Sequence, residues 1–204
     1  GYERARMQVL SALLKLRQIC NHPALIDETF RQEEDISGKY DQFLELLEEV
    51  VESGGKVLVF SQFTSMLDIL EHPLQEEGIG YLRLDGNTKN RQELVEQFNA
   101  DDNIRVFLIS LKAGGVGLNL TGANTVFLYD PWWNPMAEQQ AIDRAHRIGQ
   151  EQTVNIYKFI TKNSIEEKIL QLQQRKSHLF ENLVSEDQGF VQRLEWEDLM
   201  ELFE

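Results

Sequence analysis

The 204-residue sequence has a single cysteine and four prolines. Cys20 has no second cysteine to pair with, so the chain can form no internal disulfide, which fits a reducing compartment. A zinc site is not indicated either. Cys20 and His22 stand too close together, and the other three histidines show no ligand spacing. We therefore expect no metal ligated by this chain alone.

Long apolar runs are also missing. No stretch approaches the ~18 residues that a membrane helix needs. The first ten residues, GYERARMQVL, show no signal-peptide pattern and do not begin with Met, which indicates a fragment or a tag residue. We expect an intracellular, monomeric chain without membrane association.

Basic residues are scarce: 20 Lys and Arg stand against 34 Asp and Glu, for a net charge of −14. Nucleic-acid binding draws most of its affinity from Lys and Arg against phosphate. A free-standing DNA-binding module should therefore be basic. Any contact of this chain with DNA must be local or shared with a partner domain.

A phosphate-binding P-loop, G-x-x-x-x-G-K-[ST], is absent. The nearest candidate, GGKV (54–57), fails because Val57 replaces the hydroxyl residue and Val50 replaces the first glycine. The other Gly-Lys pair, at 38–39, is followed by Tyr40. This chain alone should not hydrolyse a nucleotide by P-loop chemistry.

The sequence does contain a regular alternation of short apolar runs and helical stretches, with 42% hydrophobic and 26% charged residues overall. Such alternation predicts an α/β fold with a parallel sheet sandwiched by helices. Ligands of such sheets bind beyond the carboxyl ends of the strands. The predicted strands are KVLVFS (56–61), YLRLD (81–85), RVFLIS (105–110), TVFLYD (125–130) and TVNIYKFI (153–160), and the predicted helices between them are 64–77, 88–99 and 136–147.

Helices are also predicted at both ends of the chain. A helical pattern ends at Asn21-His22-Pro23, and an acidic linker over 27–38 separates it from a helix over 39–53. Near the other end, Ser164-Ile-Glu-Glu167 is a capping-box pattern that begins an amphipathic helix. The last segment, LEWEDLMELFE, predicts a short acidic helix.

The loop after the third strand, SLKAGGVGLN (110–119), is rich in glycine. Closely spaced glycines let the backbone approach a phosphate or a ribose. The loop is not a dinucleotide fingerprint, because Leu120 occupies the third glycine position and the loop follows the third strand rather than the first. A purely structural turn would explain these glycines equally well.

Two further segments have candidate functional side chains. Gln140, Arg144 and Arg147 recur on one face of a predicted helix, where two guanidiniums would suit a spread phosphate charge. The alternative is ordinary surface charge. In DPWWNP (130–135), the tryptophans either pack beneath the loop or stack on a substrate or interdomain surface.

These segments together resemble the C-terminal, RecA-like motor lobe of Swi/Snf-family ATPases, which are superfamily 2 DNA translocases. The resemblance covers residues 10–184 and implies an N-terminal helix and linker at 1–36, a RecA-like helicase C-terminal domain at 37–162, and a bracing helix with an acidic tail helix at 163–204. The matching segments are LRQICNHPALI (16–26), SGKYDQFLELL (37–47), VLVFSQFTSMLDIL (57–70), LDGNTKNRQ (84–92), ISLKAGGVGLNLTGANTVFLYDPWWNP (109–135), QAIDRAHRIGQ (140–150) and FITKNSIEEKILQLQQRK (159–176).

The resemblance implies a division of labour around ATP and Mg²⁺. The first lobe, absent here, would supply the P-loop and the acidic Mg²⁺ site. The second would supply Arg144 and Arg147 to the γ-phosphate, with Arg147 as the preferred arginine finger. Gln140 would help to orient the site, and Gly117 and Asn119 match the nucleotide-facing turn of the family.

The resemblance also implies contacts with double-stranded DNA, independent of its sequence. The full-length protein would be an ATP hydrolase that translocates on duplex DNA and remodels DNA–protein complexes, while this chain would be inactive without its N-terminal RecA-like lobe. The positions that match DNA-contacting residues of the family are Ser61, Gly86, Thr88, Ser110, Lys112 and Trp132.

Two other interpretations deserve comparison. A Rossmann-type oxidoreductase would need a glycine fingerprint after the first strand, and the sequence there is SQFT (61–64). A non-catalytic interaction module with a helicase-like fold would use the C-terminal helices and Trp132-Trp133 as its surface.

Overall fold

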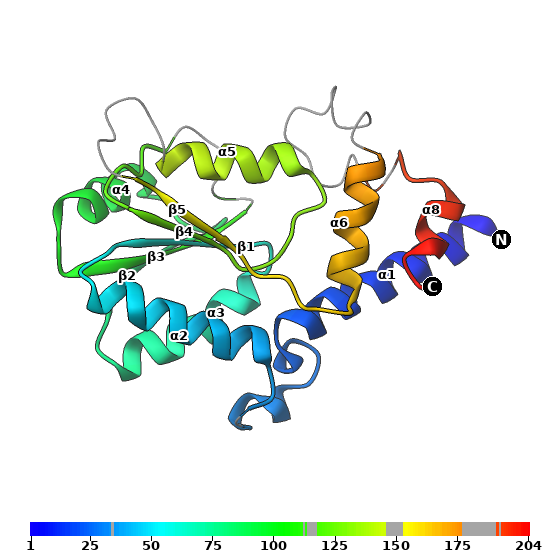
Figure 1. The fold of residues 1–204 in the computed structure, drawn as a ribbon, viewed down its shortest axis with the longest axis horizontal. Coiled ribbons are helices and arrows are strands. Elements are labelled where there is room, and N and C mark those ends of the chain that lie inside the picture. The colour runs from blue at the N-terminus through cyan, green and yellow to red at the C-terminus, as the bar shows by residue number, and fades with distance from the viewer. Residues whose placement is uncertain (34, 112, 114–117, 146–152, 177–190, 192) are drawn as a thin grey trace. The chain divides into compact units, whose positions relative to one another are not determined.

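The computed structural model describes residues 1–33, 35–111, 113, 118–145, 153–176, 191 and 193–204 (Figure 1). Contacts divide the chain into two compact units. Unit one comprises Gly1–Asp41, Pro131–Ala137 and Ile160–Glu204. Unit two comprises Gln42–Asp130 and Glu138–Phe159.

Unit two contains a five-stranded, all-parallel sheet with the order β2-β3-β1-β4-β5. The predicted α/β fold with a parallel sheet is therefore confirmed. The central strands are buried because helices cover both faces, which explains why their sequences are continuous apolar runs. The strands are β1 (Val57–Ser61), β2 (Gly80–Leu84), β3 (Ile104–Ser110), β4 (Thr125–Leu128) and β5 (Asn155–Lys158).

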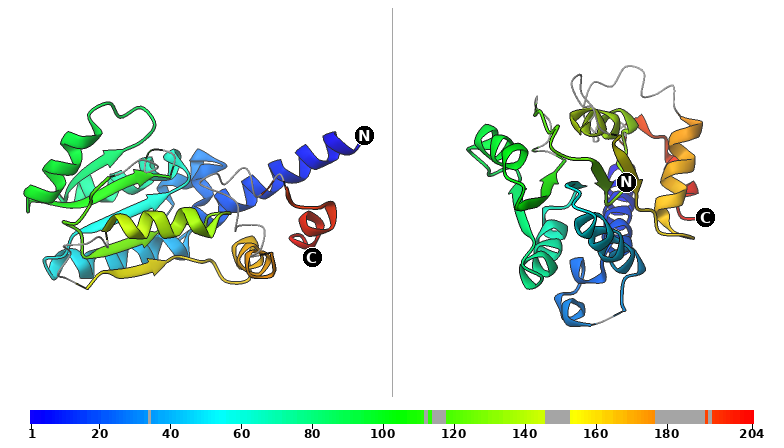
Figure 2. Two further views of the ribbon diagram at one scale, coloured as in Figure 1. Left: turned by 90° about the horizontal axis from the view of Figure 1, so that it is seen from above. Right: turned by 60° about the vertical axis from the view of Figure 1, so that its left-hand side comes forward.

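The helices of unit two lie on both faces of this sheet (Figures 1 and 2). The chain runs toward one edge of the sheet from β1 to β2 and back toward the centre from β2 to β3. Because both crossovers are right-handed, the helices in these two connections lie on opposite faces. On one face lie α2 (Gly38–Glu52) and α3 (Thr64–Glu76), and on the other α4 (Arg91–Ala100) and α5 (Pro135–Ala145).

Aromatic side chains fill the core beneath α2. The Phe43 ring of α2 packs against Phe127 and Tyr129, with centroids 5.7 and 5.5 Å apart. On the opposite face, Phe98 of α4 packs against Phe107 of β3 at 5.2 Å. These contacts hold the helices to the sheet and leave the carboxyl edge of the strands for the loops.

Unit one is helical and contains α1 (Tyr2–Asn21), the 3-10 turns Pro23–Leu25 and Glu28–Gln32, α6 (Ile165–Arg175) and α8 (Trp196–Glu201). Its apolar core consists of Leu13, Trp133, Ile165, Ile169, Leu172, Leu194, Leu199 and Leu202. Ser164 is the N-cap of α6, as predicted, and its hydroxyl accepts a hydrogen bond from the Glu166 amide. The Glu167 carboxylate, however, accepts from the Asn163 amide, so the reciprocal bond of the predicted capping box is shifted by one residue.

A buried ion pair lies within unit one, where its residues come from the ends of three helices. The ammonium of Lys39, at the start of α2, lies 2.6 Å from Glu166 at the start of α6 and 3.1 Å from the side-chain oxygen of Asn21 at the end of α1. Both charged side chains are almost fully buried. A buried charge is costly unless it is paired, so the pair sets how the ends of these helices meet.

No helix among the described residues is long and apolar enough to cross a membrane.

Candidate functional site

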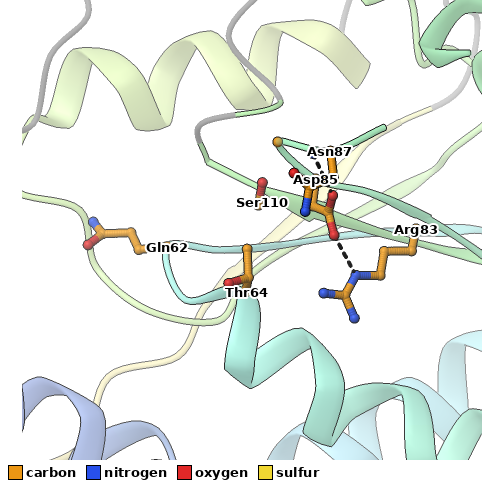
Figure 3. A pocket seen from close by; sticks show the side chains of 7 residues that line it. Gln62, Thr64, Arg83, Asp85, Asn87 and Ser110 are labelled. Carbon is orange, nitrogen blue, oxygen red and sulfur yellow. Dashed lines mark hydrogen bonds and ion pairs between the residues drawn. The ribbon is translucent and has the colours of Figure 1, made fainter. Parts of the chain in front are cut away.

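A cavity of about 220 Å³ lies in unit two, at the carboxyl ends of β1, β2 and β3 (Figure 3). Parallel strands end at one edge of the sheet, so the loops after Ser61, Leu84 and Ser110 meet there. This is the edge at which the sequence predicted a binding site. The lining residues are Gln62, Thr64, Arg83, Asp85, Gly86, Asn87 and Ser110.

Ser110 stands at the end of β3, paired in register with Ser61 of β1. Its side chain is only 2% exposed and lines the cavity. The hydroxyl oxygen has no hydrogen-bond partner among the residues that the structure describes. Leaving a buried hydroxyl unpaired costs about 1–3 kcal/mol, so a ligand with an acceptor oxygen would be stabilised here.

Ser61 has a different role. Its hydroxyl donates to Asp130 at 2.5 Å and accepts from the Phe63 amide at 3.1 Å. The second oxygen of Asp130 accepts from the Gln62 amide at 3.0 Å. Asp130 is itself buried at the end of β4. Ser61 therefore fixes the turn after β1 and does not line the cavity.

The loop after β2 is closed by its own side chains. The Asp85 carboxylate accepts from the Asn87 amide at 2.9 Å, and the Asp85 amide donates to the Thr88 hydroxyl at 2.9 Å. The Thr88 amide in turn donates to the Asp85 carbonyl at 3.2 Å. These bonds hold Gly86 at the cavity wall, whereas Thr88 supports the loop from outside the lining.

Arg83 of β2 contacts three carboxylates. Its guanidinium lies 2.5 Å from Asp68 and 3.1 Å from Glu71, both on α3, and 3.1 Å from Asp85. Burial alone would lower the pKa of Arg83, but the hydrogen bond to Asp68 and the three negative charges outweigh it and raise the pKa. Arg83 is therefore charged at every accessible pH.

The contacts of Lys56 show whether the segment GGKV (54–57) could bind a triphosphate. Its ammonium donates to the carbonyls of Phe98 and Asp101, the latter at 3.0 Å, and lies 4.6 Å from the centroid of the Phe98 ring. Burial lowers its pKa. The lysine is thus used to join β1 to α4, and this segment does not fit a P-loop. Among the described residues, no three His, Cys, Asp or Glu side chains are grouped for a metal ion.

Other predicted residues lie away from the cavity. Gln140 is exposed on α5, and Asn119 is exposed with its carbonyl accepting from the Asn99 side chain at 2.8 Å. Trp132 is 1% exposed in unit one, and its carbonyl accepts from Gln173. This burial favours packing for the Trp132 ring over stacking on a substrate or interdomain surface, the two alternatives that the sequence left open.

Four predictions fall outside the described part of the chain. Lys112, Gly117 and Arg147 are outside the described residues, and the side chain of Arg144 is as well. Their roles stay predictions.

The sequence missed most of the cavity lining. Gln62, Thr64, Asp85 and Asn87 flank predicted residues at the strand ends, and the strand-end rule could have found them. Arg83 lies inside β2, and only the register of that strand shows that it belongs to the wall.

Comparisons with known proteins identify the family. The helicase conserved C-terminal domain family matches residues 38–149. An uncharacterized ATP-dependent helicase of Mycoplasma pneumoniae is 40% identical over 204 residues, covering 99% of this chain and 19% of that protein. The human SWI/SNF-related matrix-associated actin-dependent regulator of chromatin subfamily A member 1 is 43% identical over 185 residues, covering 85% of this chain and 18% of that protein.

Solved structures of the same family also match this chain. The C-terminal domain of the Sulfolobus solfataricus SWI2/SNF2 ATPase superposes with a TM-score of 0.76 at 32% identity, covering 99% of this chain and 83% of that one. The core of the same ATPase in complex with double-stranded DNA gives 0.78 at 34% identity, covering 99% and 42%. The chain therefore belongs to the helicase conserved C-terminal domain family, as a RecA-like lobe of the SWI2/SNF2 ATPases. It spans about a fifth of the length of the curated relatives it matches.

Proposed function

We propose that this chain is the second motor lobe of a DNA-dependent ATPase that translocates on duplex DNA and remodels DNA–protein complexes. The observation that carries the proposal is the cavity at the carboxyl edge, where the buried Ser110 hydroxyl is unpaired among the described residues beside the Gly86 loop. A hydroxyl and loop amides can bind a phosphate oxygen without basic side chains. A SWI2/SNF2 core of this fold has been solved with double-stranded DNA.

In this proposal the cavity binds phosphates of one DNA strand, so recognition is independent of base sequence. Gly86 and Ser110 contact the phosphates, Lys112 adds a charge, and Ser61 and Thr88 hold the two loops in shape. The arrangement agrees with the hydrogen bonds of Ser61 to Asp130 and of Thr88 to Asp85.

ATP and Mg²⁺ would be held mainly by the N-terminal RecA-like lobe of the full-length protein. Lys56 supports this division, because its ammonium is committed to the carbonyls of α4 and the following turn. From this lobe, Arg147 and Arg144 reach the γ-phosphate, and Gln140 and Asn119 approach the nucleotide. Gln140 lies exposed on α5, one helical turn before Arg144.

The test is DNA-stimulated ATP hydrolysis by the full-length protein with Arg147→Ala. We expect turnover to fall by about 10³-fold or more while ATP binding is retained, because an arginine finger stabilises charge in the transition state. Arg193→Ala, which removes an exposed arginine of unit one, is the matched control and should hydrolyse ATP normally.

Unchanged turnover in the Arg147→Ala protein would refute the finger assignment. The 204-residue chain by itself should show no ATPase activity, and measurable hydrolysis by it would contradict the division between lobes.

A further inference from the structure

We propose that Arg83 is a positioning residue for the DNA contact: by holding Asp85, its guanidinium sets both the shape and the charge of the loop 85–88. The inference rests on the proposed function, since it concerns the same cavity. It adds a residue to that site which neither touches the phosphate nor follows from the sequence pattern.

The Arg83 side chain connects the loop after β2 to α3. Figure 3 shows its bond to Asp85. The Nε of Arg83 donates to Asp85 at 3.1 Å, while Nη1 donates to Asp68 and Glu71 of α3 at 2.5 and 3.1 Å. A guanidinium is planar, so fixing one edge on α3 also fixes the direction of the bond to Asp85. A lysine has a single nitrogen and cannot hold these positions together.

Asp85 transmits that constraint to the cavity wall. Its carboxylate accepts from the Asn87 amide at 2.9 Å, and its backbone is closed against Thr88 by two further bonds. Gly86 lies between these anchors and lines the cavity. Moving the Asp85 carboxylate would therefore move the Gly86 backbone that is proposed to meet the phosphate.

Because Asp85 is charged, its pairing with Arg83 is needed for phosphate binding as well as for the shape of the loop. Asp85 itself lines the cavity, where an unpaired carboxylate would repel a phosphate. The Arg83 side chain is only 22% exposed, so solvent screens the pair less than it would a surface pair. Arg83 is also the only cation among the cavity-lining residues that the structure describes.

The experiment uses the full-length protein and measures ATP hydrolysis against the concentration of duplex DNA. We expect Arg83→Gln to raise the half-saturating DNA concentration by about tenfold, a typical effect of one charge-assisted hydrogen bond. Turnover at saturating DNA should stay within about twofold, since the ATP site is untouched. Arg105→Gln, which loses only a bond to the Gly54 carbonyl, is the matched control.

A second variant separates positioning from direct contact. Asp85→Asn keeps an oxygen that can accept from the Asn87 amide but removes the charge. The double variant Arg83→Gln/Asp85→Asn should recover most of the DNA affinity lost by Arg83→Gln. If the double variant binds DNA as poorly as Arg83→Gln, the charge of Asp85 is not the cause of the lost affinity, and the inference that Arg83 sets that charge is overturned.

The other outcomes are also decisive. Wild-type protein without any DNA stimulation would refute the proposed function. If DNA stimulates the wild type but Arg83→Gln has the same half-saturating DNA concentration, only the positioning role is refuted. The positioning role is also refuted if Arg83→Gln loses turnover at saturating DNA while its half-saturating concentration stays unchanged. Should Arg83→Gln fail to fold, Arg83→Lys keeps the charge but cannot bond to α3 and Asp85 together, so the half-saturating DNA concentration should still rise. An unchanged concentration in Arg83→Lys would refute the role of Arg83 in shaping the loop.

Discussion

A methyl group added at Gly86 would meet no atom within 4 Å, and the backbone there does not have a positive φ. The fold itself therefore does not require a glycine at this position. Gly80 differs, because a Cβ there would collide with the Asn103 carbonyl oxygen. The absence of a side chain at Gly86 is explained if another molecule approaches the loop closely.

At the residue scale, we predict that Gly86→Ala leaves the full-length protein as stable as the wild type or more stable by about 0.4–1 kcal/mol. The half-saturating DNA concentration should nevertheless rise, by roughly the tenfold that losing one hydrogen bond of about 1.4 kcal/mol produces. Thermal unfolding and DNA-stimulated ATPase assays measure the two effects.

Gly38→Ala is the control, since Gly38 is equally open, has no positive φ and does not line the cavity. Equal DNA dependence in the two alanine variants would show that nothing approaches Gly86.

At the element scale, the C-terminal segment that includes α8 forms bonds with two other helices of unit one. Arg6 of α1 donates to the carbonyls of Val191 and Leu194, at 2.9 and 3.0 Å. Arg175 of α6 forms two hydrogen bonds with Glu201, at 2.7 and 2.8 Å. The C-terminal segment thus bonds to both α1 and α6, and its acidic residue Glu201 pairs with Arg175 of α6.

The buried apolar side chains of this segment should contribute more to the stability of unit one than its ion pairs, because exposed ion pairs contribute about 0–1 kcal/mol. We predict that Leu199→Ala lowers the free energy of unfolding by about 2–5 kcal/mol, since Leu199 is 0% exposed in the core of unit one. Met200→Ala, next to it but 39% exposed, should change it by less than about 0.5 kcal/mol.

Urea unfolding of the 204-residue chain measures both variants. Similar midpoints for Leu199→Ala and the wild type would mean that α8 does not contribute to the fold of unit one.

At the scale of the whole molecule, the charge of −14 opposes DNA binding. Even at the cavity, Arg83, the one cation in the described part of the lining, is surrounded by Asp68, Glu71 and Asp85. The described lining offers a phosphate mainly hydroxyl and backbone groups, which position a duplex without providing much affinity. Stable association should therefore require the other lobe.

We predict that the 204-residue chain binds duplex DNA with a Kd of about 10⁻⁴ M or weaker at physiological salt, in the non-specific range. Fluorescence anisotropy of a labelled duplex, titrated at several salt concentrations, measures this. Micromolar binding at physiological salt would contradict the local, low-charge contact proposed here.

Several features followed from the sequence alone because they depend on local patterns. Continuous apolar runs separated by helical stretches predicted the parallel sheet, and its carboxyl edge was the expected place of the site. Ordered motifs predicted the SWI2/SNF2 family, which the comparisons confirmed. The missing P-loop was also evident from spacing, and the buried Lys56 agrees with it.

Only the tertiary structure decided what the individual side chains contact. It pairs Ser61 with Asp130, buries Trp132, and brings Arg83 to Asp68, Glu71 and Asp85. The contacts of Ser61 with Asp130 and of Arg83 with Asp68 and Glu71 join residues from different elements, and periodicity within one element carries no information about them. A serine at a strand end looks the same in sequence whether its hydroxyl is bonded or unpaired. The fold distinguishes the bonded Ser61 from Ser110, which has no bonding partner among the described residues.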